Sequence, residues 1–295
     1  MQLISFSDRD GMRIGIFDRS TQTVLDLAQA APTLPRDMSA LIAMGPAGLA
    51  ALRAAETSGG ARLPLSSVKL LAPIPRPRRN VFAVGKNYHE HAKEFENSGF
   101  DATGGTAVPE LPIFFTKATT SVSGPGEAIP SYLDYSHSTD YEGELAVVIG
   151  TGGRGIQRAD ALRHVFGYTI INDVTARTLQ NAHKQWFLGK SLDGYCPMGP
   201  TLVTADEISD LSRLRLITRV NGELRQDASV SDLIFDVPAI IAALSAVMTL
   251  EPGDLIATGT AAGVGIGFKP PKYLAKGDVV AVTIEPIGTL ENPVA

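Results

Sequence analysis

One stretch decides how the chain is interpreted: Asp140-Tyr141-Glu142-Gly143-Glu144-Leu145-Ala146-Val147-Val148-Ile149-Gly150. Its second half is apolar, rich in β-branched residues and bounded by glycine, which predicts a β-strand. Side chains alternate between the two faces of a strand, so Glu142 and Glu144 share a face, with roughly 7 Å between their Cα atoms. Two carboxylates about 5 Å apart repel each other by roughly 3 kcal/mol at an effective dielectric constant of about 20. Such a pair persists if both groups face water, if one is protonated, or if a cation lies between them.

A second apolar strand is predicted at Val165–Ile171, and it ends in Asn172-Asp173. Burying an acidic residue at the end of a strand is costly unless the residue is paired. If the two strands are neighbours, Asp173 becomes a third carboxylate at the same cation. Oxygen ligands with open coordination positions suit Mg²⁺ or Mn²⁺, and the sequence contains neither clustered cysteines nor an HExxH pattern for zinc. We therefore predict that Glu142, Glu144 and Asp173 bind Mg²⁺ or Mn²⁺.

The residues that follow the first strand allow a different interpretation. Gly150-Thr151-Gly152-Gly153-Arg154-Gly155 matches the GxGxxG pattern, and Asp173 lies near the position of a ribose-binding acid. The segment Arg158–Val165 is short for the crossover of a βαβ unit. Glu142 and Glu144 also do not fit a parallel strand that is buried on both faces. We therefore expect these glycines to form a turn, and an NAD-dependent dehydrogenase is the minor alternative.

A histidine and a glutamate follow the short apolar strand predicted at Val81–Gly85. If this segment is helical, His91 and Glu94 occupy positions i and i+3 on one face. A carboxylate beside an imidazole selects its tautomer and raises its basicity, as a general base requires. An exposed polar helix is the alternative, and the spacing does not exclude His89 and Glu90 from the same role.

Composition narrows the class of protein. The 295 residues are 44% hydrophobic, which is enough for a sizeable core in one or two domains. The net charge of -5, without any basic stripe, argues against a nucleic-acid partner. Cys196 is the only cysteine, which excludes an internal disulfide and fits a reducing compartment. No apolar run approaches membrane-spanning length and no signal-peptide pattern opens the chain. We expect a cytoplasmic protein with no membrane partner.

Two domains are predicted, a small N-terminal module at 1–72 and a catalytic domain at 73–295. In the module, apolar strands flank Asp8-Arg9-Asp10-Gly11, which is a hairpin signal, and alanine-rich helical segments follow. Pro73-Ile74-Pro75-Arg76-Pro77 excludes helix and predicts an extended connector. The module carries no evident chemistry, so we expect it to support packing or dimer formation.

Short motifs that are weak one by one occur along the chain in a specific order. They are Asn87-Tyr88-x-x-His91-x-x-Glu94, Phe115-Thr116-Lys117, Asp140-Tyr141-Glu142-Gly143-Glu144-Leu145, Asn172-Asp173-Val174-Thr175-Ala176-Arg177, Gly189-Lys190-Ser191, Cys196-Pro197-Met198-Gly199-Pro200 and Thr258-Gly259-Thr260. Together they resemble the fumarylacetoacetate hydrolase family, in the branch that includes acylpyruvate hydrolases. The resemblance covers about Pro73 to Val294 and is looser for the leading module.

The resemblance implies an α+β fold, a mixed β-sandwich roll with a small N-terminal α/β module, which binds a divalent metal and forms a homodimer. It assigns Glu142, Glu144 and Asp173 to Mg²⁺ or Mn²⁺, His91, Glu94 and Lys190 to catalysis, and Arg177, Gln180 and Thr260 to the substrate. Thr260 would meet the substrate's carboxylate through its backbone or hydroxyl. One departure from the family pattern is a longer loop from Gly99 to Val108, which we predict to be a lid.

The reaction that these residues favour is metal-dependent hydrolysis of a carbon–carbon bond in a β-diketo acid. An acylpyruvate such as fumarylpyruvate or maleylpyruvate is the expected 2-oxo acid substrate, from the breakdown of aromatic compounds. His91, oriented by Glu94, would take a proton from the attacking water, and Lys190 would stabilise negative charge on a substrate oxygen. Isomerisation or decarboxylation of 2-hydroxymuconate-type or oxaloacetate-type 2-oxo acids is the alternative on the same metal site. A metal-binding regulatory module without activity is the alternative from a different class.

Overall fold

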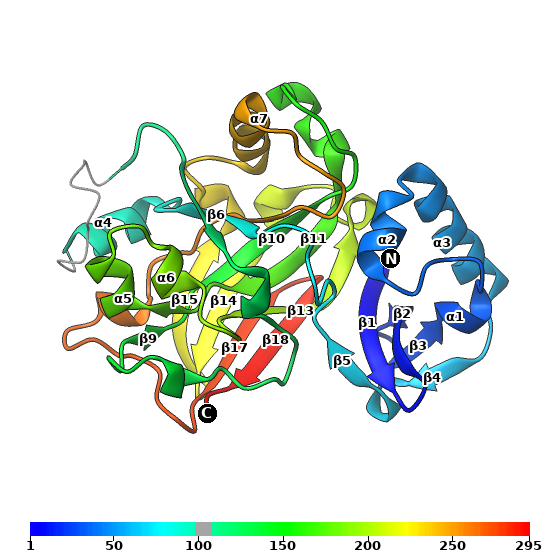
Figure 1. Ribbon diagram of the computed structural model, residues 1–295, viewed down its shortest axis with the longest axis horizontal. Coiled ribbons are helices and arrows are strands. Elements are labelled where there is room, and N and C mark those ends of the chain that lie inside the picture. The colour runs from blue at the N-terminus through cyan, green and yellow to red at the C-terminus, as the bar shows by residue number, and fades with distance from the viewer. Residues whose placement is uncertain (98–107) are drawn as a thin grey trace.

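The computed structural model describes residues 1–97 and 108–295 (Figure 1). The predicted lid, Gly99 to Val108, lies outside these described residues except for Val108. The longer strands of the described chain are arranged in a large sheet and a smaller one. A pair of short strands, β9 (Thr139–Asp140) and β12 (Thr175–Ala176), lies apart from both.

The larger sheet runs through both predicted domains in the order β4-β3-β2-β1-β13-β11-β10-β16-β6-β7, with β5 beside β1 and β8 beside β13. Its strands are β1 (Gln2–Asp8), β2 (Gly11–Asp18), β3 (Thr23–Asp26), β4 (Arg62–Pro64), β5 (Lys69–Leu71), β6 (Val81–Gly85), β7 (Ile113–Lys117), β8 (Val122–Ser123), β10 (Gly143–Ile149), β11 (Val165–Asn172), β13 (Cys196–Thr204) and β16 (Leu255–Ala257). Most neighbours are antiparallel, whereas β16 with β6 and β13 with β8 are parallel, so the sheet is mixed.

The smaller sheet packs on the catalytic part of the larger one. Its order is β15-β14-β17-β18, and its strands are β14 (Arg215–Val220), β15 (Glu223–Ser229), β17 (Val279–Ile284) and β18 (Gly288–Pro293). Leu145 and Val147 of β10 share one buried cluster with Leu216 of the smaller sheet. The alternate residues Ala146 and Val148 belong to a second cluster, which includes residues of the N-terminal module. Both faces of β10 are therefore buried, and the predicted α+β class with a mixed β-sandwich roll is confirmed.

The helices are short and lie around the sheets (Figure 1). They are α1 (Leu27–Ala30), α2 (Met38–Ala43), α3 (Pro46–Ser58), α4 (His89–Asn97), α5 (Arg177–Ala182), α6 (Phe187–Lys190) and α7 (Val237–Val247), with the 3₁₀ turns η1 (Leu65–Ser67), η2 (Thr119–Ser121), η3 (Ser131–Leu133), η4 (Arg158–His164), η5 (Ala205–Glu207), η6 (Leu211–Arg213), η7 (Val230–Asp232) and η8 (Gly265–Gly267). Aspartate side chains cap the N-termini of three of the α-helices, since Asp26 caps α1, Asp37 caps α2 and Asp236 caps α7. No helix in the described ranges is both long enough and apolar enough to cross a membrane.

The N-terminal module, shown in blue in Figure 1, lies at the opposite end of the molecule from α4. The predicted hairpin is present, because Asp8 pairs with Gly11 where β1 turns into β2. The module is joined to the catalytic part by main-chain pairing, since Leu3 of β1 lies opposite Leu202 of β13. The larger sheet is therefore continuous from the module into the catalytic part, and the domain boundary at residue 72 stays a prediction.

The GxGxxG segment does not form a dinucleotide site. It connects β10 to β11, and these two strands are antiparallel neighbours. The residues between them form the 3₁₀ turn η4 instead of a crossover helix. A Rossmann unit needs parallel strands joined by a helix whose N-terminus faces the pyrophosphate, so the minor alternative of an NAD-dependent dehydrogenase is wrong for this segment. The glycines form a turn, as we expected.

Candidate metal centre and active site

Three buried carboxylates meet at the end of the β10–β11 pair. Glu144 lies in β10, Glu142 directly precedes that strand, and Asp173 directly follows β11. Gly143 lies opposite Asn172 in the antiparallel register, which brings all three side chains together. One oxygen from each carboxylate lies within 4.8 Å of the others. The predicted metal ligands therefore form one cluster.

Two lysines and an arginine neutralise part of this cluster. Nζ of Lys190 lies 2.7 Å from Oε2 of Glu142 and 2.7 Å from Oδ2 of Asp173. Nζ of Lys117 lies 2.6 Å from Oδ1 of Asp173, while Nη1 of Arg177 lies 2.6 Å from Oε1 of Glu142. Each of these cations is almost completely buried. The positive charge is therefore concentrated on two of the three carboxylates.

Glu144 carries the negative charge that these three cations leave unbalanced. Its Oε2 accepts a hydrogen bond from the backbone N–H of Gly259 at 2.7 Å. Burial, together with the nearby charges of Asp173 and Glu142, raises the pKa of Glu144 well above its usual value near 4.5. Burial opposes ionisation of Glu142 as well, but Lys190 and Arg177 outweigh it and lower the pKa of Glu142 to about 2.

The residues present fit a divalent metal. Oδ1 of Asp173 is buried and accepts no hydrogen bond from the described residues, because its contact with Lys117 is an ion pair without hydrogen-bond geometry. The surroundings of Glu144 also disfavour its negative charge. The three buried carboxylates therefore need additional positive charge. Oxygen-only donors suit Mg²⁺ or Mn²⁺ better than softer metals. Glu142, Glu144 and Asp173 are thus suitable to hold such an ion.

The predicted proton-transfer pair is formed on α4. His91 is 4% exposed, and its Nδ1 lies 3.2 Å from Oε2 of Glu94. The carboxylate accepts a hydrogen bond from Nδ1–H, which leaves the basic lone pair on Nε2. Helical spacing of i and i+3 brings the two side chains together, as we predicted from the sequence.

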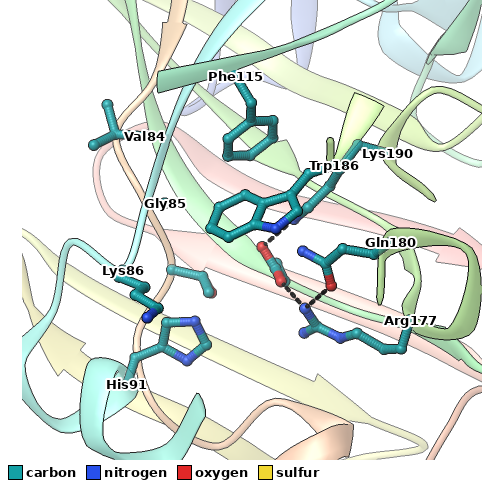
Figure 2. Close-up of a pocket in the computed structure, with 11 residues that line it drawn as sticks. Val84, Gly85, Lys86, His91, Phe115, Arg177, Gln180, Trp186 and Lys190 are labelled. Carbon is teal, nitrogen blue, oxygen red and sulfur yellow. Dashed lines mark hydrogen bonds and ion pairs between the residues drawn. The ribbon is translucent and has the colours of Figure 1, made fainter. Parts of the chain in front are cut away.

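A narrow pocket lies beside the carboxylate cluster (Figure 2). Among the residues that line it are six that the sequence nominated: His91, Glu142, Arg177, Gln180, Lys190 and Thr260. In Figure 2, His91 lies on one side of the pocket, whereas Arg177, Gln180 and Lys190 lie on the other. Glu144, Asp173 and Glu94 contact the lining residues or their neighbours but do not line the pocket themselves.

All three of the predicted substrate-binding side chains already make hydrogen bonds within the protein. Nη1 of Arg177 donates a hydrogen bond to Oε1 of Gln180 at 3.3 Å, and its Nε donates to Asp140 at 2.9 Å. The Thr260 hydroxyl donates to the carbonyl of Gly143 at 2.9 Å and accepts from Gln226 at 2.7 Å. We therefore expect any substrate contact of Thr260 to come from its backbone.

Five further residues line the pocket and were not predicted as site residues: Val84, Gly85, Lys86, Phe115 and Trp186. The Trp186 and Phe115 rings pack edge to face, with 5.3 Å between their centroids. Gly85 makes room for the indole, since a Cβ there would lie 2.2 Å from Trp186 Cζ3. Lys86 adopts a positive φ of 54°, which is uncommon for a residue with a side chain. The Phe115-Thr116-Lys117 motif was the available signal for Phe115, whereas nothing local marked Trp186.

Comparison with known proteins decides the family. The family model described as fumarylacetoacetate (FAA) hydrolase, C-terminal, matches residues 80–295. The chain belongs to the fumarylacetoacetate hydrolase family. It is therefore an enzyme of this family, as its motifs indicated.

Several relatives in the family have been named or solved. Oxaloacetate tautomerase YisK from Bacillus subtilis is 55% identical over 230 residues, covering 78% of this chain and 74% of the relative. A fumarylacetoacetate hydrolase structure from Exiguobacterium antarcticum is 44% identical with a TM-score of 0.85, covering 100% and 99% of the two chains. Maleylpyruvate hydrolase from Sphingobium sp. SYK-6, solved with manganese(II) and pyruvate, is 32% identical with a TM-score of 0.79, also covering 100% and 99%. The family therefore includes both tautomerases and hydrolases, and a divalent metal suits this site.

Proposed function

We propose that this enzyme interconverts the keto and enol forms of a short 2-oxo dicarboxylic acid of the oxaloacetate type, with Mg²⁺ or Mn²⁺ held by Glu142, Glu144 and Asp173. The observation that carries the proposal is that buried His91, which is paired with Glu94, lines the same pocket as Glu142. A proton acceptor beside a metal-binding carboxylate cluster is what removal of a proton next to a carbonyl group requires. The 55% identity with an oxaloacetate tautomerase supports the choice of substrate.

The metal would supply positive charge that favours the enolate form of a 2-oxo acid. The protein's own groups then move the proton. Nε2 of His91 takes a proton from C3 of the substrate, and the C–H electron pair becomes the C2–C3 double bond while the carbonyl electrons move to the oxygen. Lys190 stabilises this oxygen, and the His91 imidazolium gives the proton to it, which completes the enol and restores the neutral imidazole. Glu94 stabilises the imidazolium that forms in between.

Arg177 and Gln180 provide the polar wall opposite His91 (Figure 2). We assign them to the carboxylate next to the 2-oxo group, because guanidinium and amide donors suit a planar carboxylate. Arg177 is held at its Nε by Asp140 and at Nη1 by Glu142, so its orientation is set before the substrate arrives. Such preorganisation lowers the entropic cost of orienting the substrate.

Hydrolysis of an acylpyruvate is the second candidate, and it was the sequence-based prediction. The likeness to a maleylpyruvate hydrolase favours it. The same His91 would then take its proton from water, which attacks the distal carbonyl and releases a carboxylic acid together with the enolate of pyruvate. This candidate would give the enzyme a role in the breakdown of aromatic compounds, in the cytoplasm.

The homodimer is also a proposal. Tyr132, Leu133 and Tyr135 lie close together in the chain and are 72%, 42% and 76% exposed. Large apolar side chains exposed together are typical of protein–protein interfaces. Sedimentation of the wild type and of a Tyr132→Ser/Tyr135→Ser variant tests this surface, and an unchanged dimer in the variant would place the interface elsewhere.

One experiment separates the two reactions. The purified enzyme with Mg²⁺ or Mn²⁺ is given oxaloacetate, and the approach to keto–enol equilibrium is followed by the absorbance of the enol. In parallel, fumarylpyruvate and maleylpyruvate are supplied, and released pyruvate is measured with a coupled dehydrogenase. We expect acceleration of tautomerisation, abolished by a chelator. Pyruvate release without any acceleration of tautomerisation would make hydrolysis the function.

A further inference from the structure

A glycine-rich segment holds the proton-transfer pair in place. We define residues 263–267, Gly263-Val264-Gly265-Ile266-Gly267, as the glycine loop; it contains η8, which packs against α4. The backbone N–H of Gly263 donates to both oxygens of Glu94, at 3.0 and 3.2 Å. Oε2 of Glu94 in turn accepts from His91. The orientation of the base therefore depends on a backbone group of the glycine loop.

The same loop holds a second carboxylate. The backbone N–H groups of Gly265 and Ile266 donate to Oδ1 and Oδ2 of Asp140, at 2.7 and 3.0 Å. Oδ2 of Asp140 also accepts from Nε of Arg177 at 2.9 Å, and the other end of this guanidinium contacts Glu142. Asp140 is completely buried. The position of Arg177 is thereby tied to the glycine loop as well.

Close approach explains two glycines of the loop, Gly265 and Gly267. A Cβ on Gly267 would lie 2.0 Å from Oε1 of Glu94. A Cβ on Gly265 would lie 2.4 Å from the backbone carbonyl oxygen of Lys272 and 2.6 Å from Oδ1 of Asp140. Neither Gly265 nor Gly267 has a positive φ, so conformational freedom of the backbone does not account for them. The absence of a side chain lets each carboxylate approach the loop.

We infer that the glycine loop is a positioning element that orients both the base and the substrate-binding guanidinium: it sets His91 through Glu94, and Arg177 through Asp140. The inference rests on the proposed function, since it explains how the two sides of the pocket keep their geometry. Backbone N–H groups are suited to this role because their positions are fixed by the chain and not by a rotamer. Neither Asp140 nor the loop glycines touch the substrate in this account.

Gly267→Ala tests the Glu94 contact. The three atoms nearest to the added Cβ all belong to the Glu94 side chain, which can rotate away, so this variant should fold. Its kcat for tautomerisation should fall by about 10-fold or more, because His91 loses its oriented partner. Its KM and its affinity for oxalate, an enolate mimic, measured by calorimetry with Mg²⁺, should change by less than about 3-fold since the pocket wall opposite is untouched.

Asp140→Asn tests the other contact. The amide keeps the shape of the side chain but presents an N–H group to donors that need an acceptor, so Arg177 loses one of its fixed partners. We expect the affinity for oxalate to fall by about 10-fold or more, with a rise in KM, because a charge-assisted contact to the guanidinium is disturbed. The two variants should therefore affect kcat and KM differently, whereas a purely structural role would change both in the same way.

A double-mutant cycle provides the strictest test. In Glu94→Asp the carboxylate is withdrawn from the space that the new Cβ would occupy. Adding Gly267→Ala to Glu94→Asp should therefore cost much less than it costs in the wild type. Gly153→Ala is the matched control, because its Cβ would also meet mainly side-chain atoms, of Ile156 and His164, in a turn outside the pocket.

Additive losses at positions 94 and 267, or equal effects of Gly267→Ala and Gly153→Ala on kcat, would overturn the inference. So would an unchanged oxalate affinity in Asp140→Asn. Failure of the proposed function has a different signature, in which the wild type binds oxalate with Mg²⁺ but turns over neither oxaloacetate nor acylpyruvates. In that case the affinity for oxalate still tests the inference. Oxalate affinity that is lost in Asp140→Asn but kept in Gly267→Ala supports the inference. Any other pattern of oxalate affinity contradicts it.

Discussion

Nζ of Lys117 lies 2.6 Å from Oδ1 of Asp173, and neither side chain is exposed to solvent. The same ammonium group donates to the carbonyl of Val174 at 3.1 Å and to the carbonyl of Lys190. Lys117 thus connects Asp173, a candidate metal ligand, with the backbone of Lys190. A buried ion pair of this kind makes the local structure sensitive to the loss of either partner.

Lys117→Met should destabilise the enzyme measured in chelator by about 3 kcal/mol or more, because Asp173 is left as a buried charge with one cation fewer. Stabilisation by added Mg²⁺ should be larger than in the wild type, since the metal then replaces missing positive charge. Urea denaturation with and without Mg²⁺ measures both effects. Lys69→Met is the control, because its pair with Glu127 is largely exposed and should contribute at most about 1 kcal/mol. Equal effects of the two substitutions would contradict the prediction.

Glu144→Gln should separate stability from metal binding. The amide oxygen can still accept from Gly259, but the charge that burial and two neighbouring carboxylates oppose is gone. We expect the melting temperature in chelator to stay the same or rise, while the increase caused by Mg²⁺ or Mn²⁺ disappears. Glu291→Gln, at an exposed position, should retain the full response to metal. A normal metal response in Glu144→Gln would remove Glu144 from the ligand set.

His91→Gln should retain metal and oxalate binding and lose tautomerisation by roughly 10²-fold or more, the usual scale for removing a positioned base. The metal ligands come from β10 and β11, whereas His91 comes from α4, so the two functions should be separable. Calorimetry with oxalate and the enol absorbance assay measure them independently. Retained tautomerisation in His91→Gln, with hydrolysis of acylpyruvates lost, would mean that His91 activates water and that another group moves the C3 proton.

Asp8 should make part of the stability depend on pH. A hydrogen bond from Arg13 is the largest cause that lowers the pKa of Asp8 from its usual value near 3.8 to about 2. A depressed pKa in the folded state gives stability that is present above the unfolded value and is lost as the pH falls through the folded value. The difference in urea midpoint between the wild type and Asp8→Asn should therefore be largest above about pH 5 and should shrink towards pH 3. A difference that is independent of pH would contradict the assignment.

Local patterns in the sequence were sufficient for much of the fold and the site. The alternation around Glu142 and Glu144 predicted a strand with two carboxylates on one face; β10 contains Glu144, while Glu142 directly precedes it, and both carboxylates belong to one cluster. The i and i+3 spacing predicted the contact between His91 and Glu94. Both predictions succeeded because the geometry of a strand or a helix relates residues that are close in sequence. The metal ligands and the base could therefore be nominated from the sequence alone.

Tertiary structure alone decided what surrounds these residues. Lys117 reaches Asp173 across 56 positions, and the Gly263 N–H reaches Glu94 across 169. A pattern of glycines such as that of the glycine loop does not reveal which side chain fills the space they leave. Contacts of this kind depend on how distant strands and loops are packed against one another, and the period of a single element carries no information about that packing. The sequence by itself thus determined which groups we propose for the chemistry, and the packing of remote segments determined how those groups are held.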